Sequence, residues 1–219
     1  MKDTTTTTEI IRLSFDSSKP SLTIESDWLI LALVVAVLLL TYFIKRNFSK
    51  WFNWHEMEVE ISGSPKIKFK VERNDENLYI ANRIYIELTT RKAAIPIDEN
   101  NDVIEDVYDS WYKLFGIIRE EIKSVPGKYL KDHDPTSALI GLTRKILNDA
   151  MRPHLTEHQA KFRKWLSTAK EEQANKTLTP QDLQKKYPDF ANLVASMKLV
   201  NLTLIDYADE LDKLIKGKK

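Results

Sequence analysis

The sequence predicts a mainly α-helical protein: one N-terminal transmembrane helix, then a cytoplasmic α-helical bundle with a small β-hairpin near the membrane. Three observations lead to this prediction. The chain contains an uninterrupted apolar run, a short stretch of alternating apolar and charged residues around a turn, and several segments with apolar residues at helical spacing. They divide it into an extracytoplasmic arm (1–27), a membrane helix (28–46) and a cytoplasmic domain (47–219), with the hairpin at about 57–71.

The apolar run extends from Trp28 to Ile44 and contains no charge, proline or glycine. As a helix it would be about 25 Å long, which suffices for a bilayer core when flanking aromatic and basic residues lie in the interfaces. A buried helix of a soluble core is the alternative, but such helices usually keep a polar stripe. A cleaved signal peptide fits less well, because no basic segment abuts the run and no small-residue cleavage site follows it.

Charges on either side of the run predict its orientation. Lys45, Arg46 and Lys50 follow it, whereas Glu25 and Asp27 precede it, so the C-terminal domain should be cytoplasmic and the N-terminus outside. Residues 1–27 contain few bulky apolar residues and are expected to form a flexible or weakly structured arm. Four aromatic residues lie just beyond the run: Phe48, Trp51, Phe52 and Trp54. We expect them to form an interfacial belt, and the alternative is a collar that couples the domain to the membrane helix.

The segments "MEVEI" and "KIKFKV" flank the turn signal "SGSP". Apolar residues alternate with charged ones in both, which predicts a hairpin with one buried and one solvated face. The solvated face is acidic on the first strand and basic on the second, so we expect charge pairs between the strands.

Two helices are predicted next. The first begins after Asn74, with Asp75 as its cap, and ends near Lys92, although its β-branched residues leave a strand at 84–90 as an alternative. The second extends from about Asp102 to Lys123, because Pro126 and Gly127 stop it.

The rest of the chain predicts four further helices. One has Pro135 near its start, and a separate one has Pro153 in its first turn. A short capped helix lies in "LTPQDLQKKYP", and a long one extends from Phe190 to Ile215. The apolar face of this last helix comprises Leu193, Met197, Val200, Leu204, Tyr207, Leu211 and Leu214.

Sequence motifs of enzymes are missing. The chain has five glycines and no phosphate-binding glycine loop, no serine in a nucleophile elbow, and no cysteine, which excludes disulfides and thiolate metal sites. His154 and His158 would share a helix face, but no third ligand accompanies them at a suitable spacing. We therefore predict no enzyme, no metal and no cofactor.

A basic segment, "RKILNDAMRPHLTEHQAKFRK", holds six Lys and Arg residues against Asp149 and Glu157. Aromatic and histidine residues interleave with the cations, a combination that can bind phosphates and stack bases. An ordinary solvated basic face is the alternative, and contact with anionic lipid headgroups is a third interpretation. The candidate ligands are Arg83, Arg91, Lys92, Arg144, Lys145, Arg152, Lys161, Arg163, Lys164 and Trp165.

Three phrases, "NRIYIELTTRKAAIPID", "DVYDSWYKLFGIIREEIKSVP" and "LNDAMRPHLTEHQAKFRKW", resemble a group of bacterial single-span membrane proteins encoded beside antiphage nucleotidyltransferases, such as the effectors of the Hailong defence system. The resemblance covers most of residues 75–167. It implies a homo-oligomer, for example a tetramer, in the bacterial inner membrane. The helical domain would bind a nucleic-acid signal, single-stranded DNA from the neighbouring nucleotidyltransferase, and the membrane helices would open as an ion channel that disrupts the membrane potential.

A single span cannot enclose a pore, so a channel requires several copies around an axis. The apolar run would give this pore a largely aliphatic lining, and such a lining can gate by dewetting. The same residues also suit a plain anchor in the lipid. The competing hypothesis is a membrane-tethered adaptor that recruits a partner protein through its helical domain. The predicted pore residues are Leu31, Val34, Val35, Leu38, Thr41 and Tyr42.

Overall fold

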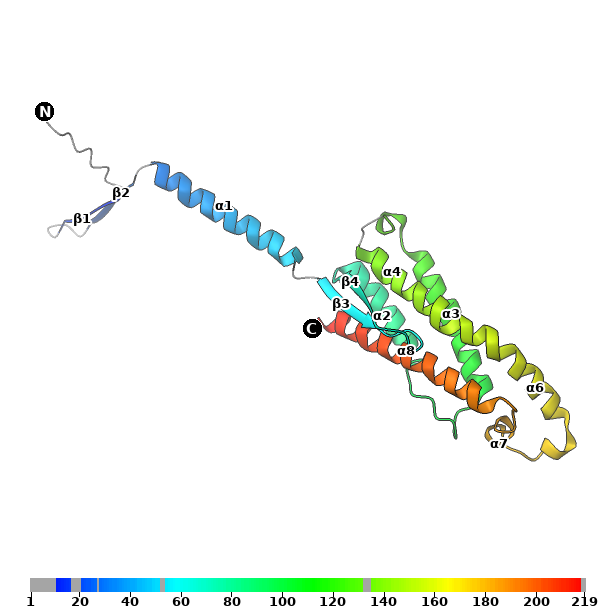
Figure 1. Cartoon of the computed structure of the whole chain (residues 1–219). Helices are drawn as coiled ribbons and strands as arrows, with labels where there is room; N and C mark the ends of the chain where they lie inside the picture. Colours follow the sequence, from blue (N-terminus) through cyan, green and yellow to red (C-terminus); the bar gives the residue numbers. More distant parts are fainter. Residues whose placement is uncertain (1–10, 17–20, 27, 52–53, 132–134, 218–219) are drawn as a thin grey trace. The chain divides into compact units, whose positions relative to one another are not determined.

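The computed structural model describes residues 11–16, 21–26, 28–51, 54–131 and 135–217 (Figure 1). The chain divides into two compact units, Met1–Phe52 and Asn53–Lys219. Much of the predicted arm, together with Phe52 of the predicted aromatic belt, lies outside the described residues.

The described part of the arm is a hairpin, whereas the sequence analysis expected a flexible segment. Strands β1 (Ile11–Asp16) and β2 (Ser21–Ser26) pair antiparallel. Leu13 lies opposite Ile24 and Phe15 opposite Leu22, so apolar residues alternate with polar ones on both strands. This alternation is the signal that the sequence analysis missed.

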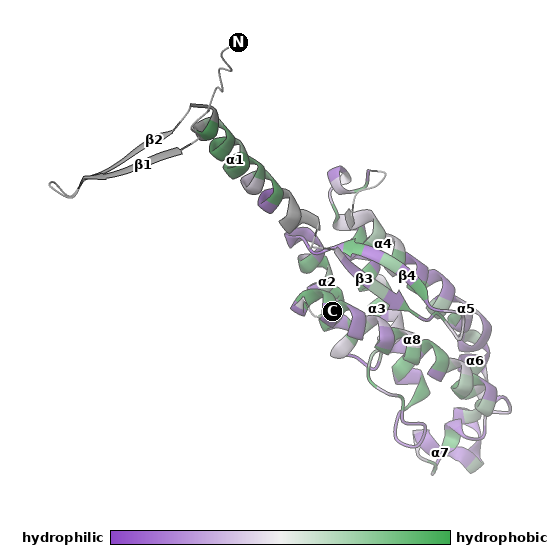
Figure 2. Cartoon of the chain, turned by 60° about the vertical axis from the view of Figure 1, so that its left-hand side comes forward, coloured by the Kyte–Doolittle hydropathy of each residue, from purple (hydrophilic) through white to green (hydrophobic). Residues whose placement is uncertain are grey.

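Helix α1 (Trp28–Trp51) contains the apolar run and continues beyond the predicted end at residue 46. Figure 2 colours much of it as hydrophobic. Its large apolar side chains from Leu33 to Ile44 are 48–66% exposed, and the Thr41 hydroxyl donates to the Leu38 carbonyl at 2.9 Å. In the part of the chain that the structure describes, no helix meets the length and hydropathy needed to cross a membrane. Side chains of α1 are described without a gap from Ala32 to Arg46, so the predicted pore residue Leu31 falls outside.

The second unit begins with the predicted hairpin, which is confirmed. Strands β3 (Trp54–Val59) and β4 (Ile67–Glu72) are antiparallel, with Val59 opposite Ile67. Glu58 and Lys68 face each other and form the expected cross-strand ion pair. Gly63 supplies a positive φ of 77° in the turn, a conformation that glycine adopts without strain.

Helices α2 (Asp75–Thr89) and α3 (Ile104–Ser124) follow as predicted. The cap of α2 is Asn74, whose side chain accepts from the Asn77 amide, so the prediction of Asp75 as the cap is wrong by one residue. The alternative of a strand at 84–90 is also wrong, because the helix continues through Thr89. Helix α3 ends two residues before Pro126, as the sequence indicated.

The next two predicted helices are one uninterrupted helical segment. It comprises α4 (Pro135–Lys145), η2 (Ile146–Met151), α5 (Arg152–His154), η3 (Leu155–Gln159) and α6 (Ala160–Glu171), where η2 and η3 are π-helical. Pro153 therefore does not begin a helix. Because proline cannot donate to the carbonyl four residues earlier, the hydrogen bonds shift around it, and the Arg152 amide donates to the Leu147 carbonyl five residues back.

The short helix α7 (Pro180–Gln184) has Thr179 as its cap, and α8 (Phe190–Lys216) closes the unit. One-turn 3₁₀ helices, η1 (Gly127–Tyr129) and η4 (Gln173–Asn175), lie in the connections. All seven apolar residues predicted for the inner face of α8 are buried. Helix α8 packs on α2, on β3 and on η2, α4 packs on β4, and α2 packs on α3, so one helical core covers one face of the hairpin.

Candidate functional site

The segment from α4 to α6 buries every fourth residue. An α-helix has 3.6 residues per turn, so a spacing of four drifts by about 40° at each step. A π-helical turn contains more than four residues, so in η2 and η3 the same spacing rotates in the opposite sense and cancels this drift. The mixture therefore holds one straight buried stripe against the core: Leu142, Ile146, Ala150, His154, His158, Phe162 and Leu166.

The same period creates a straight row on the solvent side. Its members are all exposed, and none is acidic: Arg144, Asn148, Arg152, Thr156, Ala160, Lys164 and Thr168. We call these residues the basic row.

The π-helical turns are what align the ends of the basic row. Lys164 follows Arg144 by 20 residues, which in a uniform α-helix is about five and a half turns and would put them on opposite sides. Eleven of these residues, six in η2 and five in η3, are π-helical. With roughly 4.4 residues per turn, as i→i+5 bonding implies, the separation becomes about five turns. Both cations then lie on one side.

Most of the other predicted phosphate ligands have carboxylate partners. Arg83 pairs with Glu121 through two hydrogen bonds, which raise the pKa of its guanidinium. The other ion pairs are Arg91 with Glu87 at 2.7 Å, Lys92 with Asp102 at 2.9 Å, Lys145 with Asp149 at 2.6 Å and Arg163 with Asp109 at 2.5 Å. For these residues the geometry favours the alternative of an ordinary solvated surface.

Four predicted cations remain available. Among the described residues, no carboxylate lies within ion-pair distance of Arg144, Arg152, Lys161 or Lys164. Arg152 donates from Nε to Asn148 Oδ1 at 3.2 Å, and its guanidinium lies 5.5 Å from the centre of the Phe115 ring. Three of the four belong to the basic row, and Lys161 lies one residue away from it.

Trp165 differs from the expectation of a free stacking surface. Its side chain is half-buried, and its ring lies 6.0 Å from that of Phe162 and 5.2 Å from that of Tyr187, centre to centre. Three residues that were not predicted extend the row with neutral polar groups: Asn148, Thr156 and Thr168. The four-residue spacing could have identified them.

The two histidines of the buried stripe face the core. His154 contacts the Tyr108 hydroxyl at 3.0 Å and the Ser196 hydroxyl at 2.8 Å, and burial, with His158 nearby, lowers its pKa to about 3. The His158 ring lies 4.9 Å from that of His154, and its buried Nδ1 has no hydrogen-bond partner within the described structure. No cluster of three or more His, Cys, Asp or Glu able to hold a metal ion occurs among the described residues.

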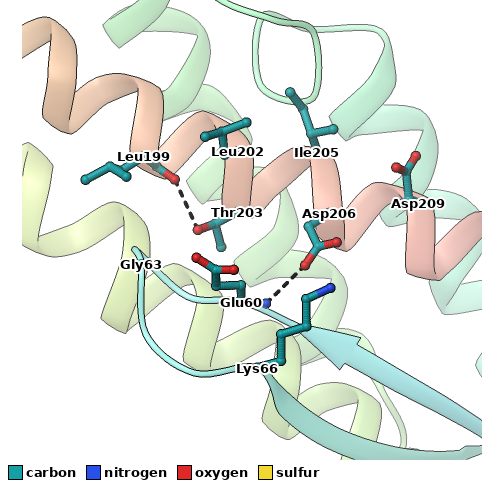
Figure 3. A pocket seen from close by; sticks show the side chains of 9 residues that line it. All are labelled: Glu60, Gly63, Lys66, Leu199, Leu202, Thr203, Ile205, Asp206 and Asp209. Carbon is teal, nitrogen blue, oxygen red and sulfur yellow. Dashed lines mark hydrogen bonds between the residues drawn. The ribbon is translucent and has the colours of Figure 1, made fainter.

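A second surface, which was not predicted from the sequence, lies where α8 faces the turn between β3 and β4 (Figure 3). Leu199 and Leu202 are 46% and 60% exposed there, beside a depression of about 300 Å³. An adjoining depression shares Lys66 and Asp206 with it. We call the first depression the acidic trough; it is lined by Glu60, Gly63, Lys66, Leu199, Leu202, Thr203, Ile205, Asp206 and Asp209.

Side chains of α8 also cover the free edge at the end of β3 and in the turn that follows it. The amides of Glu58, Glu60 and Ser62 donate to Glu210 Oε2 at 3.3 Å, Asp206 Oδ2 at 3.0 Å and Thr203 Oγ1 at 3.0 Å, respectively. These acceptors take the place of a neighbouring strand and so protect the edge. The trough is therefore held at a fixed position against the hairpin.

Comparisons of the chain with protein-family models, with curated proteins and with solved structures found no match.

Proposed function

We propose that this protein is an oligomeric membrane effector of bacterial antiphage defence, in which a nucleic-acid signal on the basic row gates an ion-conducting pore. The observation that carries the proposal is the basic row itself. Arg144, Arg152 and Lys164 lie on an acid-free stripe and have no carboxylate partner among the described residues. Cations in this state can exchange small counterions for the phosphates of a single strand, which favours binding at low salt.

The membrane part of the proposal is supported by the run from Trp28 to Ile44. Its residues carry no charge, and apolar side chains point outward on all sides of α1. Exposed apolar surface of this extent requires a cover, and lipid is the cover that an apolar helix of about 25 Å suits. The resemblance to Hailong effectors supplies the defence context and the nucleotidyltransferase as the source of the signal.

Gating requires the signal to bind the open and the closed assembly with unequal affinity. Each chain contributes one apolar helix, so the pore would be formed by several copies around an axis. The predicted lining, which includes Val34, Leu38 and Thr41, is largely aliphatic and suits a gate that closes by dewetting.

Binding of single-stranded DNA to the purified full-length protein tests the role of the basic row. We expect the triple variant Arg144→Ala, Arg152→Ala, Lys164→Ala to bind a fluorescent oligonucleotide more weakly. The magnitude of the salt dependence, d log K/d log [salt], should fall by roughly 2, because each lost phosphate contact lowers it by about 0.7. The matched control is Lys145→Ala, Arg163→Ala, Lys170→Ala, which removes three cations that already have carboxylate partners. Equal losses in both variants would contradict the assignment.

The membrane potential of expressing bacteria tests the channel. A voltage-sensitive dye should report depolarisation when the protein is expressed with its genomic neighbour and challenged with phage. Replacement of residues 28–44 by an unrelated transmembrane segment should abolish the response.

A membrane-tethered adaptor is the second candidate, because the exposed Leu199 and Leu202 offer a surface for a partner protein. The same replacement distinguishes the two. An adaptor keeps its activity with any anchor, whereas a channel loses it.

A further inference from the structure

We propose that the acidic trough of one copy docks onto the basic row of a second copy of this chain. The inference rests on the proposed function in one respect, that the chain acts as an assembly of several copies. It adds the two surfaces that meet and the charges that match them.

Charge complementarity is the first observation. The trough is lined by three carboxylates, Glu60, Asp206 and Asp209, and by one cation, Lys66. Within the described structure, no cation forms an ion pair with Glu60 or Asp209. The basic row has the opposite imbalance, because it contains three cations and no acidic residue. Each surface therefore offers the charges that the other lacks.

Shape is the second observation. Leu199 and Leu202 form an exposed apolar ridge on α8 beside the carboxylates (Figure 3). Between Arg152 and Lys164 the basic row contains only small side chains, Thr156 and Ala160, and both are exposed. Small residues allow a ridge to approach closely. The Leu side chains would then lie over Thr156 and Ala160. The carboxylates of α8 follow the leucines along the helix, so they would face Arg152, the cation at one end of this small-residue stretch.

The two surfaces belong to different helices and share no residue, so the contact is heterologous. Repetition of a heterologous contact produces a ring when the rotation closes. A ring is the arrangement that a pore formed by single spans requires. The basic row cannot hold a neighbour's trough and a nucleic-acid strand at once, so the signal would compete with this contact and thereby couple binding to assembly.

Cysteine cross-linking in the full-length protein tests the contact directly, because the chain has no cysteine of its own. Two differently tagged copies, one with Leu202→Cys and one with Ala160→Cys, are co-expressed, purified in detergent and oxidised. We expect a disulfide-linked heterodimer, because Cα atoms within about 7 Å can form this bond. The control replaces Ala160→Cys by Tyr112→Cys on α3, a position that is 69% exposed.

A charge exchange adds a second readout. Asp209→Lys in the Leu202→Cys copy should lower the heterodimer yield about threefold, and Arg152→Glu in the Ala160→Cys copy should restore it, which a merely misfolded variant would not do. Single-stranded DNA should also lower the yield. An unchanged yield with DNA bound would overturn the shared use of the row.

The outcomes separate this inference from the proposed function. The trough-to-row contact would be overturned, and the proposed function left standing, if an assembly of several copies gave no heterodimer above the Tyr112→Cys control. The same conclusion would follow if the copy with Leu202→Cys became linked only to another copy of itself or to another protein. A monomer that binds no single-stranded DNA at low salt would overturn both.

Discussion

His154 shows how a single residue couples the core to pH. It is 3% exposed, it bridges α3 and α8 through Tyr108 and Ser196, and its pKa is lowered to about 3. The folded protein therefore keeps the imidazole neutral over a range in which the unfolded chain, with a pKa near 6.5, binds a proton. Protonation of the unfolded state lowers stability as the pH falls from about 6.5 toward 3.

The variant His154→Gln should reveal this effect. We expect the wild-type protein to lose about 2 kcal/mol of unfolding free energy between pH 7 and pH 5 through this group. His154→Gln will be less stable at pH 7, but its stability will fall less steeply over the same interval. Denaturant unfolding in detergent at several pH values measures the difference, and parallel curves for the two proteins would refute the assignment.

Asn201 secures the loop between α2 and α3. Its Nδ2 donates to the carbonyls of Ala93 at 2.6 Å and Ile95 at 3.0 Å, and its Oδ1 accepts from the Ile97 amide at 3.2 Å. Asn201→Ala would leave three backbone groups unpaired, so we expect a loss of about 3 kcal/mol and faster proteolysis within 92–103. The control is Asn192→Ala, an exposed residue whose side chain, among the described residues, bonds only Asp189. Similar losses in both variants would count against this role.

At the scale of elements, the period of four in α4 to α6 decides which residues face the solvent. The buried stripe and the basic row lie on opposite sides of one helical segment that contains both α-helical and π-helical turns. Pro153 lies between the two π-helical parts. Sequence reasoning applied a uniform 3.6-residue period and treated Pro153 as the start of a helix. It therefore found the cations but could not align them.

The turn that follows β3 supplies a prediction at the same scale. The double variant Thr203→Val, Asp206→Ala removes the acceptors of the Ser62 and Glu60 amides. We expect faster hydrogen exchange at these two amides and a destabilisation of about 2 kcal/mol, about one for each lost hydrogen bond. Asp209→Ala on the same helix is the control, since its side chain is exposed and accepts no hydrogen bond from the described residues. Unchanged exchange would show that α8 does not protect these two amides.

At the scale of the whole molecule, an apolar helix and a helical domain occur in one chain, and neither provides a pore alone. The proposed channel depends on assembly, and its gate on the aliphatic side chains of α1. One substitution tests that gate. Leu38→Ser adds a polar group to the predicted lining, so we expect water to enter and the membrane to depolarise without phage challenge.

Leu39→Ser is the matched control, because it makes the same chemical change on an adjacent face of α1 outside the predicted lining. A voltage-sensitive dye in expressing bacteria measures both variants. Equal depolarisation in the two would show general damage to the membrane and not a wetted gate.

The sequence by itself determined the hairpin at about 57–71, the inner face of α8 and the helices of the second unit except the helix start expected at Pro153, because periods of two and 3.6 follow directly from backbone geometry. It also determined the apolar run. Tertiary structure decided which basic side chains form ion pairs, since pairs such as Arg163 with Asp109 join residues far apart in the chain. It decided the straight basic row through the π-helical turns, and the trough through contacts between α8 and the turn that follows β3. Both depend on hydrogen bonds and neighbours that no local pattern specifies.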